Sequence, residues 1–335
     1  MRITQNFTNR TYLKNNNRLL SNMNKSMTKI WTQKNFLRAS EDAINASRAM
    51  TVRKSLRELD MYDENLEAAK GVFAAAETSL TTLGHDVYLD VQTKLETACN
   101  GTYNKDDLKI FANELRNYAG FAIETLNADY AERQLFGGTN NSAPPFKTIE
   151  NADGTTTVTY NGVAVNDITD VSAVPGSKPI YVDIGIGIKY NENYEIDPQT
   201  AVDVSMNGAE LTGYGKETGD DGKVYSKNYV QLIFDAAHAL ENGDVEYANA
   251  TLDRFYDANA HVLTEITTLG SKQNSMDFYM TKNDDYRMSL KERQNNVEGC
   301  DMNQQIIDLE ATEAAYNAIL QMSSTILPKS IFDFI

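Results

Sequence analysis

The chain has 335 residues, which is enough for two or three domains with a sizeable core. Its formal net charge of -16 argues against nucleic acid as a partner, because phosphate binding needs a clustered cationic surface. No run approaches the about 18 apolar residues of a membrane-spanning helix, and the N-terminus lacks the apolar core of a signal peptide, so we expect a cytosolic protein unless it is exported without cleavage.

The first 35 residues predict a weakly amphipathic helix that is polar, rich in Asn and free of Pro and Gly. Every charged residue before Glu41 is cationic. Because Asn is a poor helix former, we expect this arm to order only when it packs against partner helices. A membrane-surface helix is the alternative, but the apolar stripe is thin and its aromatic anchor, Trp31, lies at the end. The stripe consists of Leu13, Leu20, Met23, Met27 and Ile30.

A long helix is predicted from Ser40 to about Ala98. Ser40 is the expected N-cap, and Glu41 and Asp42 follow where the helix dipole favours negative charge. Apolar residues then recur at alternating steps of three and four, which is the seam of a coiled coil. An unbroken helix of this span would reach roughly 85 Å, so we expect a rod. The seam residues are Leu59, Tyr62, Leu66, Ala69, Phe73, Ala76, Leu80, Leu83 and Val87.

A second rod helix is expected to fold back along the first. The long helix should end at Gly101 in a left-handed conformation, and Asn104 should cap a helix that continues to about Arg133. The short loop between the two helices is typical of antiparallel neighbours. The stripe of this helix is Leu108, Phe111, Leu115, Tyr118 and Ala122.

Residues 137–227 contain most of the glycines and prolines and predict an inserted β-rich domain. The β-prone run 155–160 lies between Asp153-Gly154 and Asn161-Gly162, which is typical of hairpins. Residues 180–188 alternate apolar with small or polar side chains, as a half-buried strand does.

Helical pattern returns near Asn228, breaks at Asn242-Gly243-Asp244 and resumes with the same three-four spacing. Its seam is Leu252, Phe255, Asn259, Val262, Ile266, Leu269, Gln273, Met276 and Met280. A last, acidic helix is expected from about Asn303 to Leu327, stopped by Pro328 and followed by an apolar tail. The apolar residues of this helix and tail are Ile306, Leu309, Tyr316, Leu320, Ile331, Phe332 and Phe334.

These elements predict a multidomain α+β fold, in which an antiparallel helical coiled-coil rod is built from both N- and C-terminal segments and carries a β-rich insert. We divide the chain into terminal arms (1–39 and 300–335), a rod (40–136 and 228–299) and the insert (137–227). The cationic first arm and the acidic last arm are complementary in charge. Neither can bury its stripe alone, so we predict an assembly interface formed by the apolar residues of both arms.

No catalytic, cofactor or metal site is predicted. Gly185-Ile186-Gly187 lacks the third glycine of a dinucleotide loop, and Asp220-Asp221-Gly222 has too few ligand positions for calcium. Cys99 and Cys300 are expected at distant places in the rod, so we interpret both as free thiols. The three histidines lack the spacing of metal ligands and are interpreted as packing or surface residues: His85, His238 and His261.

Several segments resemble the flagellin superfamily. They are the start Met1-Arg2-Ile3, SEDAINAS at 40–47 and the ending ILPKSIFDFI. The stretch LNADYAERQLFGGTNNSAPPF at 126–146 is most similar to the hook-filament junction proteins within that superfamily. The chain departs from the family at 32–35, where a glycine-containing turn is usual, and at Ala43, where proline is common.

The resemblance implies a structural protein and not an enzyme. It implies export through the flagellar type III channel with an export chaperone, without cleavage, which would replace the cytosolic expectation. It also implies a ring of copies between hook-associated protein 1 and the flagellin filament. A flagellin-type filament subunit is the alternative, and a cytosolic coiled-coil scaffold or an enzyme with its site in the insert is the rival from another class.

Overall fold

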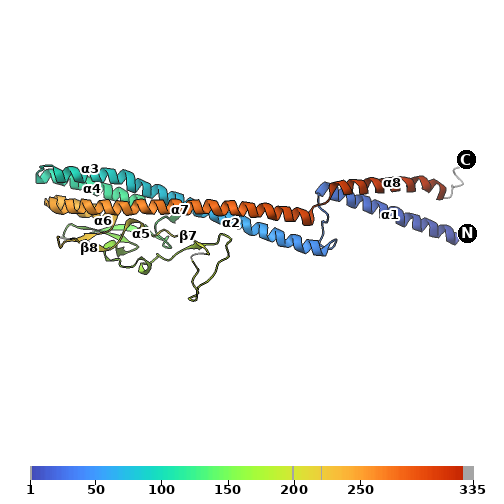
Figure 1. Ribbon diagram of the computed structural model, residues 1–335, viewed down its shortest axis with the longest axis horizontal. Helices are drawn as coiled ribbons and strands as arrows, with labels where there is room; N and C mark the ends of the chain where they lie inside the picture. The colour runs from blue at the N-terminus through green and yellow to red at the C-terminus, as the bar shows by residue number, and fades with distance from the viewer. Residues whose placement is uncertain (1, 198–199, 220, 327–335) are drawn as a thin grey trace. The chain divides into compact units, whose positions relative to one another are not determined.

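The computed structural model describes residues 2–197, 200–219 and 221–326, whose contacts form two compact units (Figure 1). The terminal unit comprises Met1–Leu59 and Asp284–Ile335, and the central unit comprises Asp60–Asn283. No helix in the described ranges is both long and apolar enough to cross a membrane.

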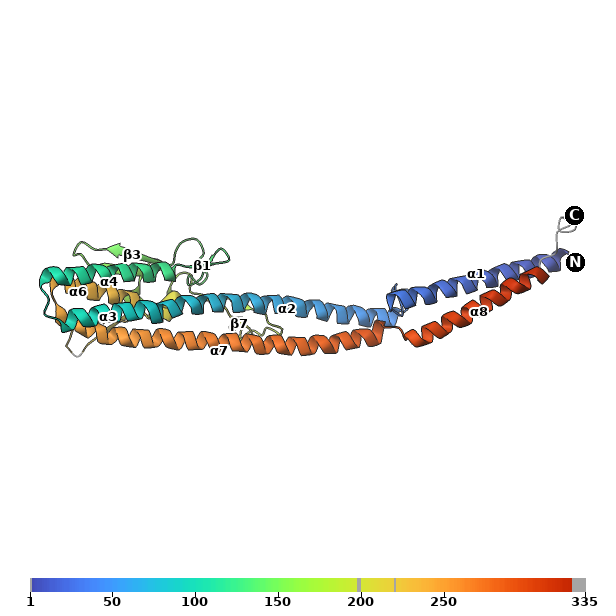
Figure 2. The same cartoon turned by 90° about the horizontal axis from the view of Figure 1, so that it is seen from above.

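The helices of the central unit form a bundle in which the long helices over residues 43–81 and 245–298 are an antiparallel pair (Figure 2). Two polar contacts show the antiparallel direction of that pair: Asn283 Nδ2 lies 2.9 Å from Asp63 Oδ1, and Gln273 Nε2 lies 2.6 Å from Glu77 Oε2. Most predicted seam residues of both helices are buried, so the α+β fold class with its antiparallel helical core is confirmed. The helices are α2 (Ala43–Thr81), α3 (Tyr88–Asn100), α4 (Lys105–Leu126), α6 (Tyr229–Asn242) and α7 (Val245–Glu298), of which α2 and α7 also enter the terminal unit.

A π-helical segment, η1 (Thr82–Val87), interrupts the long helix, so the expectation of an unbroken α-helix is wrong here. Buried residues at Leu83, Val87, Val91 and Leu95 are separated by steps of four, which shifts the buried stripe relative to the three-four seam. The wider π turn accommodates that shift, because it adds a residue to the turn. The Leu83 carbonyl accepts the Tyr88 N–H and also the hydroxyl of buried Tyr229, at 2.7 Å.

We predict that Tyr229→Phe destabilises the central unit by about 1 kcal/mol, because the variant loses a buried hydrogen bond while the aromatic packing stays. Urea unfolding followed by circular dichroism would measure this change. The matched control is Tyr190→Phe, whose side chain is 65% exposed and should leave the midpoint unchanged. Equal midpoints for both variants would mean that the hydroxyl does not support η1.

Helix ends in this unit agree only partly with the sequence predictions. Asn104 caps α4 as predicted, since its side chain accepts the N–H groups of Asp106 and Asp107. Gly101 is extended and not left-handed, and the Tyr103 ring occupies the space of a Cβ there. The helix ends at Leu126 and not near Arg133, because the Asn127 side chain pairs with both backbone polar groups of Phe146, each at 2.9 Å.

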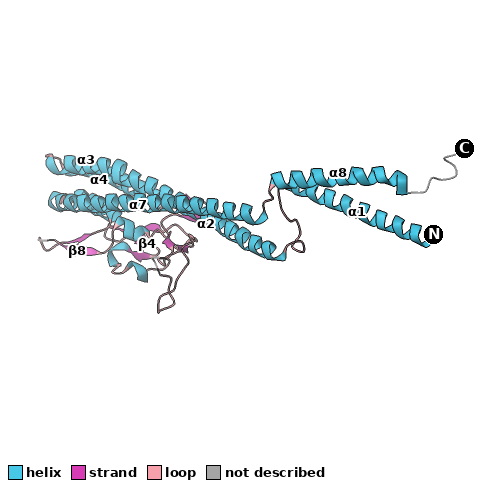
Figure 3. Ribbon diagram, turned by 45° about the vertical axis from the view of Figure 1, so that its right-hand side comes forward, coloured by secondary structure: helices cyan, strands magenta, loops and turns pink. Residues whose placement is uncertain are grey.

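The insert contains short antiparallel strands (Figure 3). The predicted hairpin is confirmed, because residues 156–160 pair with 146–150 and with 163–164. Asn161 and Gly162 have positive φ in the second turn. The prediction of a strand over 180–188 is wrong for most of that range. Only Tyr181–Val182 form a strand, because Gly185 and Gly187 turn the backbone at positive φ. The strands are β1 (Asp129–Tyr130), β2 (Arg133–Gln134), β3 (Phe146–Glu150), β4 (Thr156–Tyr160), β5 (Val163–Ala164), β6 (Tyr181–Val182), β7 (Val202–Asp203), β8 (Lys216–Thr218) and β9 (Val224–Ser226), with helical turns α5 (Gly208–Thr212), η2 (Val165–Asp167) and η3 (Val171–Ala173).

The insert shares one hydrophobic core with the helices. Buried Gln231 on α6 acts as an additional partner for β4: its Nε2 donates to Thr156 O at 2.8 Å, and its Oε1 accepts from Val158 N at 2.7 Å. Tyr160 donates its hydroxyl to Phe136 O at 3.0 Å. Such buried, satisfied contacts fix the insert against the bundle.

Candidate assembly surface

The terminal unit contains α1 (Arg2–Thr32) and α8 (Met302–Ile326), which lie side by side in Figures 1 and 2. They run antiparallel. Cys300 Sγ, just before α8, is 3.4 Å from the Lys29 carbonyl near the end of α1, whereas Phe7 and Met322 line one cavity at the opposite ends. Both terminal helices are therefore present as predicted, and α1 pairs with α8.

This helix pair buries no side chain in the parts whose side chains are described, residues 7–32 of α1 and 302–322 of α8. Phe7 is 70% exposed and Trp31 75%, although both are large apolar groups. In α6, by contrast, most side chains are buried. Apolar surface exposed on this scale is typical of a protein that binds a partner.

The structure places the predicted assembly residues in three groups. Leu20, Met23, Met27, Ile30, Leu309 and Tyr316 are half-buried, and Leu13, Ile306 and Leu320 are exposed. Ile331, Phe332, Phe334 and Pro328 lie outside the described residues. The predicted stripe omitted four exposed apolar residues, whose only signal is their apolar character in polar helices: Phe7, Trp31, Ile307 and Met322.

A short backbone pairing joins the α1–α2 connection to the α7–α8 connection, and we call it the terminal bridge (residues 33–35 with 298–300). Asn35 N donates to Glu298 O at 2.7 Å, and Cys300 N donates to Gln33 O at 3.1 Å. Lys34 and Gly299 form the antiparallel pair between these bonds. The bridge therefore fixes the places where both terminal helices leave α2 and α7.

The Glu298 carboxylate supports the terminal bridge from α7. It is nearly buried and accepts from both Arg53 Nε (2.7 Å) and Arg53 Nη2 (2.5 Å), and Lys34 Nζ lies 3.9 Å away. The hydrogen bond from Arg53 holds the pKa of Glu298 below its ordinary value. Phe36 packs in a small buried cluster with Ala46 and Ala49 beside it.

The cap of α2 differs from the prediction. The helix begins at Ala43, and Asp42 is the N-cap because its Oδ1 accepts from Asn45 N at 3.0 Å. Glu41 Oε2 instead accepts the N–H groups of Leu37 (2.9 Å) and Arg38 (3.4 Å). These bonds lower the pKa values of Glu41 and Asp42, and the expectation that Ser40 caps the helix is wrong.

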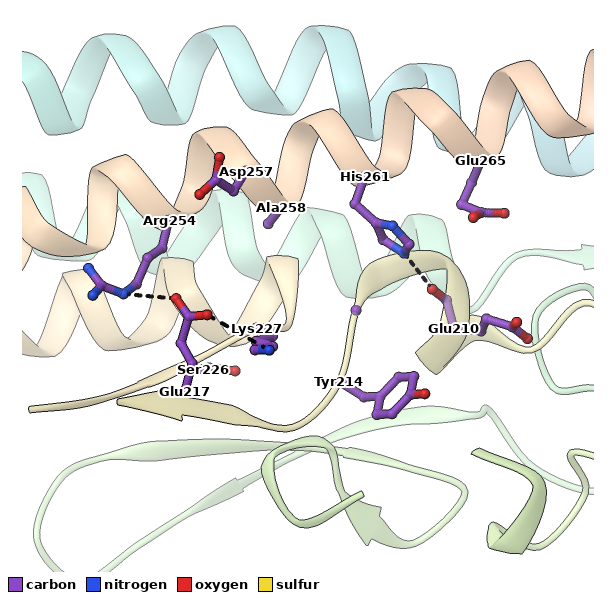
Figure 4. A pocket seen from close by; sticks show the side chains of 11 residues that line it. Glu210, Tyr214, Glu217, Ser226, Lys227, Arg254, Asp257, Ala258, His261 and Glu265 are labelled. Atoms are coloured by element: carbon purple, nitrogen blue, oxygen red, sulfur yellow. Dashed lines mark hydrogen bonds and ion pairs between the residues drawn. The ribbon is translucent and has the colours of Figure 1, made fainter. Parts of the chain in front are cut away.

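A separate cleft of about 580 Å³ lies in the central unit between α7 and the insert (Figure 4). Glu217 pairs with Arg254 Nε at 3.2 Å and with Lys227 Nζ at 3.8 Å, and His261 Nε2 lies 2.8 Å from the Glu210 carbonyl. Arg254 and His261 thus join α7 to the insert, whereas Lys227 pairs within the insert. Among the described residues, no group of His, Cys, Asp and Glu is arranged to hold a metal, and both cysteines are free.

The first part of the chain, which contains α1, α2, α3 and α4, is similar to a known protein family. Residues 3–141 match the family model of the bacterial flagellin N-terminal helical region. This part of the chain is therefore similar to the N-terminal region of bacterial flagellin. A sequence comparison with curated proteins finds no match.

Solved structures of flagellar proteins are similar to this chain in fold. A Vibrio parahaemolyticus protein assigned as a flagellar hook-associated protein is 17% identical, with a TM-score of 0.56 over 77% of this chain and 100% of that chain. FlgL of Xanthomonas campestris is 15% identical, with a TM-score of 0.54 over 73% of this chain and 99% of that chain. FlgL of Legionella pneumophila, described as the flagellar junction protein, is 14% identical over 75% and 99% of the two chains, and its TM-score of 0.45 adds nothing to the fold comparison.

Proposed function

We propose that this chain is a hook-associated protein 3, the structural component of the bacterial flagellum that joins the hook, through hook-associated protein 1, to the flagellin filament. The observation that carries the proposal is the α1–α8 pair, whose described side chains are all at least partly exposed in a chain with a flagellin N-terminal region. Such helices gain stability only when other copies or partners cover them. The role is mechanical, and we propose no enzymatic step.

The apolar side chains of the two terminal helices would supply the contacts between copies. Burying a leucine contributes about 1.5–3 kcal/mol, whereas ordering each residue costs about 1–2 kcal/mol. A single pair of helices therefore gains little, and many copies in a ring must act together. We propose the predicted residues from Leu13 to Phe334 as this interface, and we keep the division into arms, rod and insert as a proposal.

The proposed place of action is outside the cell, at the hook-filament junction. The chain would leave through the flagellar type III export apparatus without a cleaved signal peptide, and an export chaperone would keep the apolar arms from associating before export. An acidic chain of pI about 4.7 gives no support for nucleic acid as a partner.

The alternative is a filament subunit of the flagellin type, since the terminal helices serve both roles. Copy number and place distinguish the two. Antibody labelling against the insert should decorate a narrow band at the hook tip for a junction protein. Labelling along the whole filament would support the filament subunit instead.

Deletion of the gene is the direct test, and we predict cells with intact hooks, no filaments and flagellin monomers shed into the medium. Flagellin has no platform on which to polymerise if the junction is absent. Electron microscopy of the cells and immunoblots of the medium would measure both effects, with the intact gene returned on a plasmid as the control. Normal filaments on the deletion strain would contradict the proposal.

A further inference from the structure

The terminal helices of one chain carry opposite charges that they do not neutralise between them. Between residues 2 and 32 all charged residues are Lys or Arg, and between 302 and 326 all are Asp or Glu. Yet no ion pair joins α1 to α8 among the described residues. Contacts between the half-buried faces hold the two helices together, so their charges stay available for another molecule.

A groove of about 860 Å³ in the terminal unit collects the positive charge. It lies between α1 and the connection to α2, and apolar Leu20, Phe36 and Leu37 contribute to its lining. Its cations are Lys25, Lys29, Lys34 and Arg38.

The four cations of the groove outnumber the two acidic residues that also line it, so the groove keeps a net positive charge. Glu41 and Asp42 accept backbone N–H groups, and the nearby charges of Arg38 and Lys25 also contribute to the lowered pKa of Glu41. Lys29 donates to the neutral Asn35 side chain at 3.0 Å, while Lys25 and Arg38 have no ion-pair partner among the described residues. The groove therefore fits an occupant that is both apolar and anionic.

The outer face of α8 has this chemistry. Ile306 and Ile307 are 42% and 58% exposed, and Glu310 and Glu313 follow on exposed positions, spaced to share a face with Ile306. Neither carboxylate has an ion pair among the described residues. The α8 of the same chain contributes nothing to the lining of the groove, because it packs elsewhere on α1.

We propose that the groove between α1 and residues 34–42 binds the acidic outer face of α8 from a second copy of the chain. This inference rests on the proposed function, because it names the contact by which neighbouring copies join. Apolar side chains would enter the groove, and Glu310 and Glu313 would pair with Lys25 and Arg38. Charge pairing of this kind gives the contact its specificity.

Charge reversal in the deletion strain tests the pairing. Lys25→Glu with Arg38→Glu, and separately Glu310→Lys with Glu313→Lys, should each lower the fraction of hooks that bear filaments by about tenfold. Combining all four substitutions should restore that fraction to within about threefold of wild type. The matched control is Lys282→Glu, an exposed lysine of the central unit, which should change nothing. Immunoblots of the medium would show whether each variant is exported.

Cross-linking between copies gives a second readout that does not depend on filament counts. With Cys99→Ser and Cys300→Ser in both chains, one copy carries Arg38→Cys and the other Glu310→Cys, and the two are co-expressed in the deletion strain. Oxidation should give a disulfide-linked dimer only when both variants are present.

Two results would overturn the inference: reversal variants that build filaments as wild type does, or no disulfide-linked dimer when the Arg38→Cys and Glu310→Cys copies are assembled together. If the deletion strain itself keeps its filaments, the proposed function fails first. If the deletion removes filaments but the reversals have no effect, only the pairing of α8 with the groove fails.

Discussion

Amide hydrogens of α1 and α8 in the isolated monomer should exchange with solvent about a hundredfold faster, or more, than those of α6. Local opening of a helix costs little free energy when it exposes few buried contacts, whereas a buried helix opens only with most of the unit. The described side chains of α1 and α8 are all at least partly exposed, and most of those in α6 are buried. Hydrogen exchange measured by mass spectrometry would compare peptides from these helices directly.

The same measurement on chains incorporated at hook tips supplies the control. Covering the terminal helices with neighbouring copies should slow their exchange toward that of α6, because the apolar faces are then buried. Slow exchange of α1 and α8 in a verified monomer would mean that the pair is stable alone. That result would remove the main physical argument for assembly through these helices.

The sequence predicted the long helices well because their seams repeat. Leu66, Phe73 and Leu80 are buried at the expected register, and α6 ends within the break expected at 242–244, where Gly243 is left-handed. A periodic apolar stripe specifies helix type and buried face together. The Asn104 cap was predictable because a cap acts on its own next turn, and Asn228, near which the next helix was expected, caps α6 in the same way.

Features that depend on distant partners were not predictable in this way. Tyr229 lies far along the chain from the Leu83 carbonyl that it supports in η1, and Asn127 ends α4 only because Phe146 returns to meet it. The insert has short strands where glycines and turns dominate, so alternation over 180–188 gave a misleading signal. Tertiary hydrogen bonds overrode local preference at η1 and at the end of α4.

The candidate assembly surface shows the same limit. Its location on the terminal helices followed from thin apolar stripes of opposite charge, which are local signals. The terminal bridge could not be predicted from local signals, because Arg53 and Glu298 are separated by 245 positions and neither lies in an apolar pattern. Ser40 was expected as the cap and Asp42 takes that role for a similar reason, because the residue that caps a helix depends on the path of the chain before it.

Replacing Glu298 by Ala should loosen the terminal bridge and cost the terminal unit about 1.5–3 kcal/mol, the range for hydrogen bonds to charged groups. The lower part of that range is expected, because the Arg53 side chain is 43% exposed and water can replace part of the contact. Limited proteolysis should then cut faster within residues 33–42, while the central unit keeps its unfolding midpoint. Glu58→Ala is the matched control, since its pair with Lys54 is exposed on α2 and should contribute almost nothing.

Acid should produce the same loosening in the wild-type chain. The pKa of Glu298 is lowered from its ordinary value of 4.5, chiefly by the hydrogen bond from Arg53. A carboxylate with a depressed pKa in the folded state contributes stability above its unfolded pKa and loses that contribution as the pH falls through the folded pKa. Glu41 and Asp42 have lowered pKa values as well, so cleavage within residues 33–42 should accelerate below about pH 4.5.

The variant Glu298→Gln separates this carboxylate from the other two. Gln keeps the shape and one acceptor but cannot titrate, so the variant should start less stable at neutral pH and lose less on acidification than wild type. An unchanged acid response would assign the effect to Glu41 and Asp42 instead.

Because residues 34–42 also form one side of the proposed groove, a bridge loosened by Glu298→Ala should lower filament formation together with protease resistance. Normal filaments on a strain whose bridge is demonstrably open would show that copies can join without it.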